Sequence, residues 1–547
     1  MIFHFSISLV FFPIPALQQC IDSTVSTYLC RMEKDRHISG GKQVARNATF
    51  LFIRLLLVMA VTFYTSRLIY EALGVEDYGI YVLIGGLGLS FIFFSSSLSN
   101  AAQRFLAYAI GQNDIEEAKR IVGASLLIHI SLAVIAMIVG EAVGLYLIHH
   151  SLKIPPERIT AALWVYHLTI LSLSFYLVGA VYESILIARE NMRLYAYLGI
   201  LEALLKLVLA ALLFVLPGDK LELYAALFIG TVLILKGVLV LLVRRLYPEA
   251  RVWIFKDKAV LARMGSFIGW NGFATLVWSI NNQGTDVVLN IFFGPIVNAA
   301  RGIANQINSA VGSFTFNFFS AVHPQIVKSY ANGNIPYFKR LVFSSSRFGY
   351  YLMLMLSLPL MLRMDYVLKL WLNDVPAEAS DFAIWILIYA LVNVLSSPPW
   401  FGMQAVGHIR RFIIVGSIIS MLALPAMYVA FLFGLEALWA IKILAAVRVL
   451  YVLGGYEVLC RFVSALDWQA YIKEVIGPVL AVSAIATLSC FGLHRLVPDG
   501  LWGLMLLVCL STLANMVIIW VLGIRSNERT MALLWLKNKF SLIFRKR

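Results

Sequence analysis

The residues of this chain that are best suited to bind or react are charged side chains inside long apolar segments. Arg54, Lys206, Arg301 and Arg448 are basic, and Asp286 is an acidic counterpart. A charged side chain costs about 2.5 to 3.5 kcal/mol at the centre of a membrane-spanning helix, so it is usually retained for a function. Guanidinium and ammonium groups at such depth can neutralise an anionic ligand. These groups are therefore candidate binding residues.

The position of each basic residue along its apolar segment decides which role we expect for it. Arg448 lies near the middle of its segment and cannot easily reach either membrane surface, which favours a position facing a cavity. Lys206 is also near mid-segment, but Glu202 lies four residues earlier on the same helical face, so a structural ion pair and substrate binding are equally open. For Arg54, function and extension toward the surface are both open.

Four further basic residues lie within about two helical turns of a segment end. A long aliphatic stem lets such a residue extend its charge to the membrane surface, which is the favoured interpretation for this group. The group comprises Arg67, Lys236, Arg347 and Lys442.

Amide side chains recur at steps of three or four residues and so form polar helical faces. Such faces favour a water-filled cavity over hydrogen bonds that only hold helices together, although both remain open. Asp286 could pair with Arg301, or it could be a site for a coupling cation or proton. The faces contain Asn282 and Asp286 in 265–292, Arg301, Asn305 and Asn308 in 295–323, and Asn100 near the end of 78–101 with Gln103 two residues beyond that segment.

Apolar segments long enough to cross a bilayer must position all of these residues. The chain has 547 residues, of which 61% are hydrophobic and 13% charged, with a mean hydropathy of +0.84. A membrane-spanning helix needs about 20 apolar residues. This criterion predicts an all-α polytopic membrane protein of about fourteen spans. The segments are 48–70, 78–101, 121–148, 162–187, 195–216, 222–243, 265–292, 295–323, 341–362, 382–405, 412–434, 437–460, 474–494 and 501–523.

The distribution of Lys and Arg predicts the orientation of these spans. Thirty of the 44 basic residues fall, counting from Arg31, before the first span, in alternate loops and in the tail, whereas six fall in the opposite loops. The positive-inside rule then places both termini in the cytoplasm. We expect the chain to be a multi-pass protein of a bacterial inner membrane. Because topology accounts for most of the net charge of +15, a nucleic-acid partner is not expected.

An internal repeat divides the spans into two lobes. Gly74, between the first two spans, corresponds to Gly294, between the seventh and eighth, at an offset of 220 residues. Gly111 aligns with Gly333 at an offset of 222, which one small insertion reconciles. Six spans separate the copies, so both lobes have the same membrane orientation, as in transporters that work by alternating access.

The repeat and the charge pattern together define the organisation of the chain. We expect Met32 to be the true start, with residues 1–31 absent from the product, although a cleaved signal peptide is an alternative. The parts are a cytoplasmic N-terminal segment (1–46), an N-lobe of six spans (47–243), a cytoplasmic linker (244–264), a C-lobe of six spans (265–460), two further spans (461–523) and a basic amphipathic cytoplasmic tail (524–547).

Enzymatic chemistry has little support in the sequence. The five cysteines show neither CxxC spacing nor a ligand cluster, so no metal or disulfide is indicated, and no cofactor is expected beyond a Na+ or H+ coupling ion. The loops are too short to form a catalytic domain. Glu71, Glu76 and Asp77 leave a polyprenyl-dependent glycosyltransferase or polymerase as a minor alternative.

The segment from Leu73 to Tyr81, LGVEDYGIY, follows Arg54 and the Thr65-Ser66-Arg67 run at the start of the apolar region. This pattern resembles the polysaccharide-biosynthesis (Wzx-like) oligosaccharide flippases of the multidrug/oligosaccharidyl-lipid/polysaccharide (MOP) exporter superfamily. The resemblance covers nearly the whole chain from about Gly40 and implies a MATE/MOP-like fold with a V-shaped chamber. On matching helices, Arg54 and Arg301 are the candidates for binding a pyrophosphate, and Asp286 for a cation.

The resemblance implies a flippase that moves a polyprenyl-pyrophosphate-linked oligosaccharide to the periplasmic leaflet for cell-surface polysaccharide biosynthesis. Its partners would be the lipid-linked oligosaccharide, membrane lipid and other polysaccharide-assembly proteins. A cation-coupled small-molecule exporter of the same fold is the nearer alternative. The predicted substrate-binding residues are Arg54, Asn100, Gln103, Lys206, Asn282, Arg301, Asn305, Asn308 and Arg448.

Overall fold

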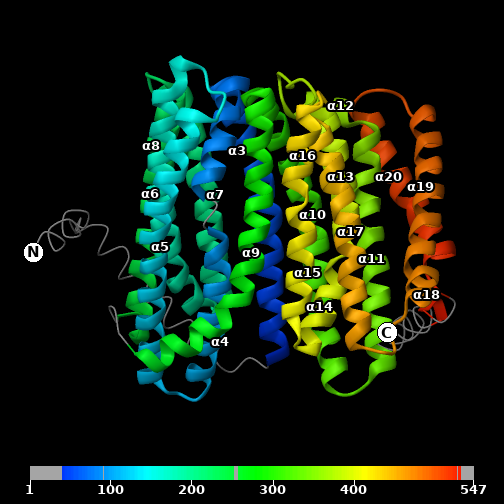
Figure 1. Cartoon of the computed structure of the whole chain (residues 1–547), viewed down its shortest axis with the longest axis horizontal. Helices are drawn as coiled ribbons and strands as arrows, with labels where there is room; N and C mark the ends of the chain where they lie inside the picture. The colour runs from blue at the N-terminus through cyan, green and yellow to red at the C-terminus, as the bar shows by residue number, and fades with distance from the viewer. Residues whose placement is uncertain (1–39, 90–91, 252–256, 526–527, 531–547) are drawn as a thin grey trace, which may run out of the picture.

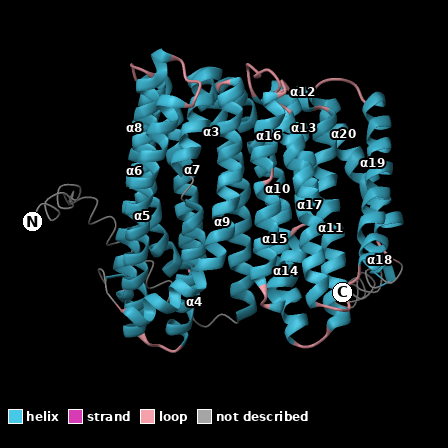
Figure 2. Ribbon diagram, viewed as in Figure 1, coloured by secondary structure: helices cyan, strands magenta, loops and turns pink. Residues whose placement is uncertain are grey.

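The computed structural model describes residues 40–89, 92–251, 257–525 and 528–530, and all of its regular elements in these ranges are helical (Figure 2). The helices run side by side and their connecting loops gather at two ends (Figure 1). We call the end that carries α12 (Met364–Trp371) the upper end and the opposite end the lower end. The start at Met32 and most of the basic tail, which were predicted from sequence, fall outside the described residues.

The N-lobe occupies the left of Figure 1. The first of its long helices, α3, consists of two helices that meet at the non-helical Gly74, and short turns such as η2 (Pro156–Arg158) and η3 (Pro248–Arg251) connect or follow the later ones. They are α3 (Gly40–Leu89), α4 (Ile92–Gly111), α5 (Ile115–His150), α6 (Ile159–Ala188), α7 (Met192–Val215) and α8 (Lys220–Leu246).

The C-lobe follows in the middle of the view. Two of its predicted spans are broken: Pro398 and Pro399 begin a new helix after Ser396, and Pro425 follows a second break at Leu422. Proline lacks the backbone N–H that continues a helix, which explains both breaks. Its long helices are α9 (Lys258–Phe293), α10 (Pro295–Ala331), α11 (Ile335–Leu362), α13 (Ala379–Val394), α14 (Ser397–Val406), α15 (Ile409–Met421), α16 (Ala423–Leu432) and α17 (Trp439–Phe462).

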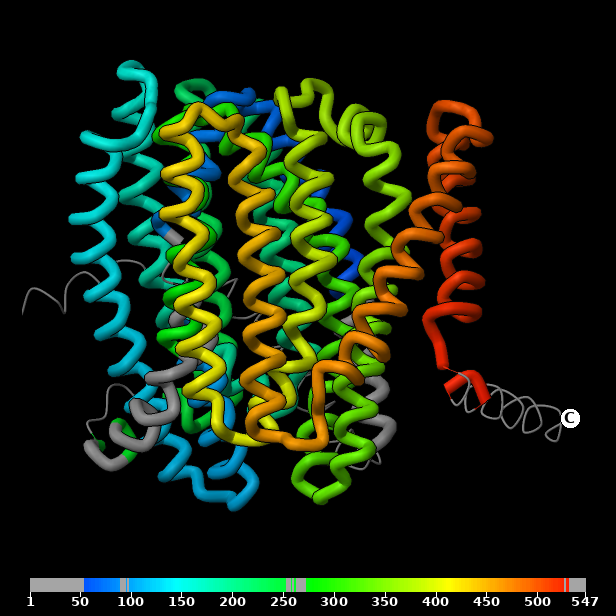
Figure 3. Tube along the Cα trace, turned by 45° about the vertical axis from the view of Figure 1, so that its right-hand side comes forward, coloured from blue at the N-terminus to red at the C-terminus, as the bar shows by residue number. Residues whose placement is uncertain are grey.

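Two further long helices stand at the edge of the molecule, where Figure 3 shows them in orange and red. They are α19 (Gly477–Leu496), preceded by α18 (Trp468–Tyr471) and η4 (Ile472–Ile476), and α20 (Leu501–Ile518), followed by η5 (Ile519–Gly523). Arg347 of α11 ties them to the C-lobe: its guanidinium lies 2.5 Å from the Glu528 carboxylate and donates to the Glu474 carbonyl at 3.0 Å.

Two basic residues expected to extend to the surface are buried in ion pairs instead. Arg347 is 1% exposed, and Lys236, which is 7% exposed, lies 2.6 Å from the carboxylate of Glu183. A buried charge with a partner on a neighbouring helix is stable without reaching water. The prediction was wrong because depth along one helix does not reveal an acid on the next.

The internal repeat is visible in the backbone itself. Gly74 (φ 76, ψ 173) and Gly294 (φ 85, ψ −174) share a conformation that is essentially restricted to glycine. The second pairing requires a correction, because the residue that matches Gly333 (φ 70) in its left-handed turn is Asn113 (φ 57) and not Gly111. The offset is therefore 220 at both places, and no insertion is needed.

Eleven helical segments within the described ranges are long and apolar enough to cross a membrane. Large apolar side chains such as Ile138, Leu488 and Trp502, which are 67%, 72% and 83% exposed, cover the outer faces as expected beside lipid. The predicted number of fourteen stays a prediction, since 78–101, 265–292 and 295–323 are not among the eleven as separate spans. These are the three segments that carry the predicted polar faces.

Candidate functional site

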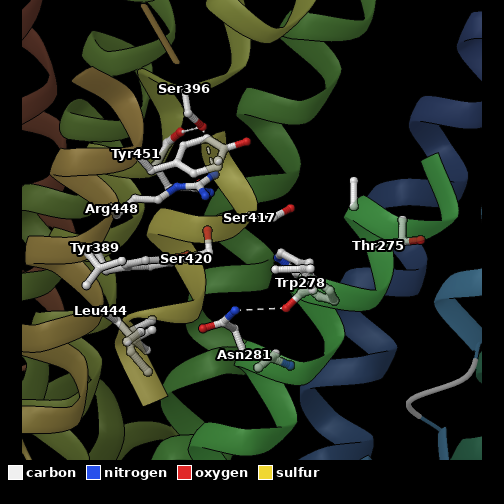
Figure 4. Close-up of a pocket in the computed structure, with 18 of the residues that line it drawn as sticks. Thr275, Trp278, Asn281, Tyr389, Ser396, Ser417, Ser420, Leu444, Arg448 and Tyr451 are labelled. Carbon is white, nitrogen blue, oxygen red and sulfur yellow. Dashed lines mark hydrogen bonds between the residues drawn. The ribbon is translucent and has the colours of Figure 1, made fainter. Parts of the chain in front are cut away.

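The C-lobe encloses a cavity of about 650 Å³. Helices α9, α10, α13, α14, α15 and α17 contribute its walls, and amide, hydroxyl and aromatic side chains point into it (Figure 4). Five of the predicted binding residues line this cavity: Asn282, Arg301, Asn305, Asn308 and Arg448. We call it the C-lobe cavity.

Arg448 of α17 lines the C-lobe cavity beside Tyr451 and Ser396 (Figure 4). Its guanidinium donates to the Ser396 hydroxyl at 2.9 Å and lies 4.2 Å from the centre of the Tyr451 ring. Its Nε has no hydrogen-bond partner, and no ion pair joins it to a carboxylate of the described residues. Arg448 therefore carries a positive charge that no carboxylate of the described residues balances.

Arg301 of α10 is the second cation in the wall of the C-lobe cavity, and only 3% of its surface is exposed. One of its terminal nitrogens forms an ion pair with Asp286 of α9, and the other donates to the Asn282 amide oxygen at 3.1 Å. Asp286 therefore already has a basic partner. Its predicted role as a cation or proton site stays a prediction.

A second cavity of about 560 Å³ lies between the lobes, and we call it the inter-lobe cavity. It is lined by residues of α3, α6, α7 and α8 on one side and of α9 and α10 on the other. Lys206 contributes to the wall while its ammonium group lies 2.8 Å from Glu202, so the predicted pair within α7 is present. Asn282 and Asn305 line both cavities.

Three predicted residues line neither cavity. Arg54 packs on α7, where its guanidinium lies 4.7 Å from the centre of the Tyr195 ring and against Gly199. Asn100 is exposed and Gln103 half-buried on α4, away from both groups of lining residues. Their helical spacing was correct, but the position of α4 relative to the other helices decides which of its faces meets a cavity.

Several lining residues were not predicted. Tyr78, Tyr81, Tyr176 and Tyr224 line the inter-lobe cavity, and Tyr389 and Tyr451 the C-lobe cavity. An aromatic residue within an apolar segment looks the same in the sequence whether it packs in a core or faces a cavity. Ser396 was missed as well, although the neighbouring Pro398-Pro399 pair is a signal in the sequence for a helix break beside it.

The lobes are held together at the upper end. Trp371 donates its indole N–H to the Phe63 carbonyl at 2.9 Å, and Asn373 accepts from Arg67 at 2.9 Å and donates to Glu71 at 2.7 Å. Helices α3 and α10 also approach closely here, where a Cβ on Gly79 would lie 1.9 Å from the Pro295 carbonyl oxygen. We call this set of contacts the upper seal.

The central helix α10 differs between its two halves. In its upper half, every residue from Asn298 to Ala304 is buried. In its lower half, Ser309, Asn317 and Ser320 are exposed at helical spacing on one face. An exposed polar face on a central helix belongs beside water rather than lipid. This half of α10, on which Phe316 is also 71% exposed, is therefore less closely covered by neighbouring helices than the upper half.

The chemistry of these cavities is that of binding. The residues that line the C-lobe cavity include two arginines and no acid, together with amides and hydroxyls that can hydrogen-bond to sugars or phosphates. Among the described residues, no group of three His, Cys, Asp or Glu side chains could hold a metal ion.

Comparison with known proteins identifies the fold. The MatE family model matches residues 51–212. An inward-facing multidrug resistance MATE transporter of the MOP superfamily matches with 15% identity and a TM-score of 0.64, over 76% of this chain and 98% of its own. Its outward-facing conformation matches with 15% identity and a TM-score of 0.58, over 77% and 96%.

A MOP superfamily transporter from Pyrococcus furiosus, described as having a binding pocket of reverse polarity that suggests a different function, matches with 14% identity and a TM-score of 0.58, over 77% of this chain and 96% of its own. No curated protein matches in sequence. The chain has the fold of MATE transporters of the MOP superfamily, which are not enzymes.

Proposed function

We propose that this chain, built on the fold of MATE transporters, is an alternating-access flippase for an anionic, lipid-linked oligosaccharide. The cargo would enter from the cytoplasmic leaflet, bind between the lobes and leave toward the periplasmic leaflet, for use in cell-surface polysaccharide biosynthesis. No bond has to be broken in this process, so the protein needs binding groups and two conformations rather than a catalytic site.

The observation that carries this proposal is the free positive charge of Arg448 in the C-lobe cavity. An arginine at membrane depth without an acidic partner is costly, and a ligand phosphate would compensate it with charge-assisted hydrogen bonds. Arg301 in the same wall supplies a second guanidinium, as a pyrophosphate requires. Asn305 and Asn308 offer amide groups to the sugars, while the prenyl tail can remain in the bilayer.

The arrangement of the lobes agrees with the first step of this cycle. The upper seal closes one end, and the exposed polar face of α10 lies toward the other, which the distribution of basic residues predicts to be cytoplasmic. This is the conformation that would receive a cargo made in the cytoplasm. The opposite conformation requires the upper seal to break.

A small-molecule exporter is the second candidate, because multidrug transporters share the fold. Its cargo would have to be anionic or neutral, since the unbalanced positive charge of Arg448 in the C-lobe cavity repels a cationic drug. The relative from Pyrococcus furiosus, described by its reverse pocket polarity, supports the use of pocket charge to separate functions within this fold.

The test is the leaflet in which lipid-linked oligosaccharide accumulates. In the strain that carries the gene, we expect deletion or Arg448→Ala to retain the oligosaccharide on the cytoplasmic leaflet and to reduce surface glycan at least tenfold, because one charge-assisted contact contributes about 1.5 to 3 kcal/mol. Lectin access to the glycan in spheroplasts and inverted vesicles measures its location.

Arg461→Ala is the matched control, since Arg461 is 70% exposed at a helix end and pairs with Glu457. This variant should restore normal surface glycan at equal protein level. Normal surface glycan in the deletion strain, when no second flippase is present, would contradict the proposed function. Loss of drug resistance without any glycan defect would favour the small-molecule exporter.

A further inference from the structure

The ion pair between Asp286 and Arg301 spans the hairpin that Gly294 forms between α9 and α10. Asp286 lies eight residues before this glycine and Arg301 seven residues after it. Both residues are buried, at 5% and 3% exposure. The Asn282 amide oxygen accepts a hydrogen bond from the other terminal nitrogen of Arg301 and completes the arrangement.

This pair forms part of the boundary between the two cavities. Arg301 lines the C-lobe cavity, Asp286 lines the inter-lobe cavity and Asn282 lines both. Any anion that reaches Arg301 from the C-lobe cavity therefore approaches the group that Asp286 already occupies. Asp286 and such an anion compete for one guanidinium.

A chain of hydrogen bonds connects the same pair to the N-lobe. The Asn298 amide donates to the backbone carbonyl of Asp286 at 2.9 Å and accepts from the Asn290 amide at 3.2 Å. Asn290 in turn accepts at 2.7 Å from the backbone N–H of Lys153, in the N-lobe loop between α5 and α6. Asn290 and Asn298 are fully buried. A shift of α9 at Asp286 would therefore disturb a contact between the lobes.

We propose that the Asp286 carboxylate is a built-in counter-anion for Arg301, which a phosphate of the cargo displaces, and that this displacement weakens the contact between the lobes at Lys153. The inference rests on the proposed function, because it requires a cargo that carries phosphate. Asp286 is a positioning residue in this scheme: it acts on the cargo through Arg301 and does not touch it.

The physical reason lies in the charge of the empty cavity. With Asp286 in place, one of the two arginines is neutralised, so the empty cavity carries one uncompensated guanidinium, that of Arg448, rather than two. A pyrophosphate offers more oxygens than a carboxylate and can bridge Arg301 and Arg448, so it can replace Asp286. The released carboxylate then lacks its partner, so α9 can shift at Asp286. The hydrogen bonds through Asn298 and Asn290 carry this shift to Lys153.

The binding test uses purified full-length protein with undecaprenyl pyrophosphate, inorganic pyrophosphate and undecaprenol as probes. We expect Asp286→Asn to bind both pyrophosphates about tenfold more tightly than wild type, because the competing anion is gone. Undecaprenol lacks phosphate and should show no gain. Glu183→Gln is the matched control, since it also removes the acid of an intramembrane pair, with Lys236, but neither residue lines a cavity.

The conformational test measures the upper end of the same proteins. Spin labels at Glu76→Cys and Ala377→Cys, in a chain without other cysteines, report the distance between the lobes there, and both positions are exposed. Undecaprenyl pyrophosphate should lengthen this distance in wild type. In Asp286→Asn, the longer distance should already be populated without the probe.

Each outcome separates the two proposals. If wild type does not bind undecaprenyl pyrophosphate, the proposed function fails and this inference fails with it. If wild type binds but Asp286→Asn gains no more affinity than Glu183→Gln, only the role of Asp286 is overturned. Weaker binding by Asp286→Asn would also overturn it, because the carboxylate would then assist the cargo rather than compete with it.

Discussion

At the scale of single residues, the arginines of this chain have different roles that their partners decide. Arg448 has no acidic partner among the described residues, Arg301 has Asp286 and Arg347 has Glu528. The position of each arginine along its apolar segment predicted only whether it faces a cavity or extends to the membrane surface. It could not distinguish Arg347 from a residue that extends to the surface, because the partner acid lies about 180 residues away in the chain.

Arg158 at the upper end binds two acids, Asp77 and Asp219. Asp219 also accepts hydrogen bonds from the backbone N–H groups of Leu221 and Glu222 at the start of α8. Burial opposes the charge of Asp219, but the bonds from Arg158 and from the backbone outweigh it and lower the pKa of this carboxyl below its ordinary value of 3.8. A lowered pKa means that the folded state favours the ionised form.

We expect the Asp219 carboxyl to make the stability of the folded protein decrease as the pH falls. Its contribution is fully present above the unfolded-state pKa and is lost as the pH falls through the lower folded-state value. Thermal unfolding of the purified protein should therefore show a larger drop in Tm between about pH 5 and pH 3 for wild type than for Asp219→Asn. Asp365→Asn is the control and should keep the wild-type drop. Equal drops in all three proteins would show that Asp219 contributes nothing.

At the scale of elements, spacing predicted which helices face a cavity more reliably than it predicted which residues do. The polar faces of 265–292 and 295–323 became the cavity-lining faces of α9 and α10, because amides in lipid need water or partners. The same reasoning was insufficient for Asn100 and Gln103 on α4, since neighbouring helices decide the face. Alignment by identical glycines misplaced Gly111, because Asn113 can adopt the turn conformation that Gly333 adopts.

Gly79 is the residue that allows α3 and α10 to approach at the upper end. A Cβ there would lie 1.9 Å from a backbone oxygen of Pro295, which no side-chain rotation can relieve. We expect Gly79→Ala to separate the two helices and to shift the protein away from the sealed conformation. The distance between labels at Glu76→Cys and Ala377→Cys should lengthen without any ligand.

Gly237 of α8 provides the control, because nothing lies within 4 Å of a Cβ built there. Gly237→Ala should leave the label distance unchanged and should raise the free energy of unfolding by up to about 1 kcal/mol, since alanine favours the helix. An unchanged distance in Gly79→Ala would mean that α3 and α10 can shift without opening the seal.

At the scale of the whole molecule, the structure predicts which side reagents can enter. Ser320 is exposed on the lower half of α10, and Ala300 is fully buried in the upper half. In a chain without other cysteines, a membrane-impermeant maleimide should modify Ser320→Cys in inverted vesicles and not in intact cells. Ala300→Cys should resist the reagent in both. Modification of Ser320→Cys from outside would contradict either the predicted orientation or the sealed upper end.

The two-lobed architecture was predictable from the sequence because the repeat and the charge pattern are both long-range signals. The number of spans was harder to predict, since α4, α9 and α10 are not among the described segments that are long and apolar enough to cross a membrane. Hydropathy measures suitability for lipid, whereas α4, α9 and α10 are partly suited to water. The tyrosines of the inter-lobe cavity were missed for a related reason: a tyrosine side chain is compatible with lipid and with water.

The hairpin of α9 and α10 also bears on how the protein enters the membrane during synthesis. Within the residues that the structure describes, neither helix is among the segments apolar enough to cross a bilayer by itself, and each carries one charge of the Asp286–Arg301 pair. Because Gly294 folds the two helices back on each other, the charges can meet before either helix meets lipid. We expect the translocon to release this hairpin into the membrane as one unit, in which Asp286 and Arg301 neutralise each other.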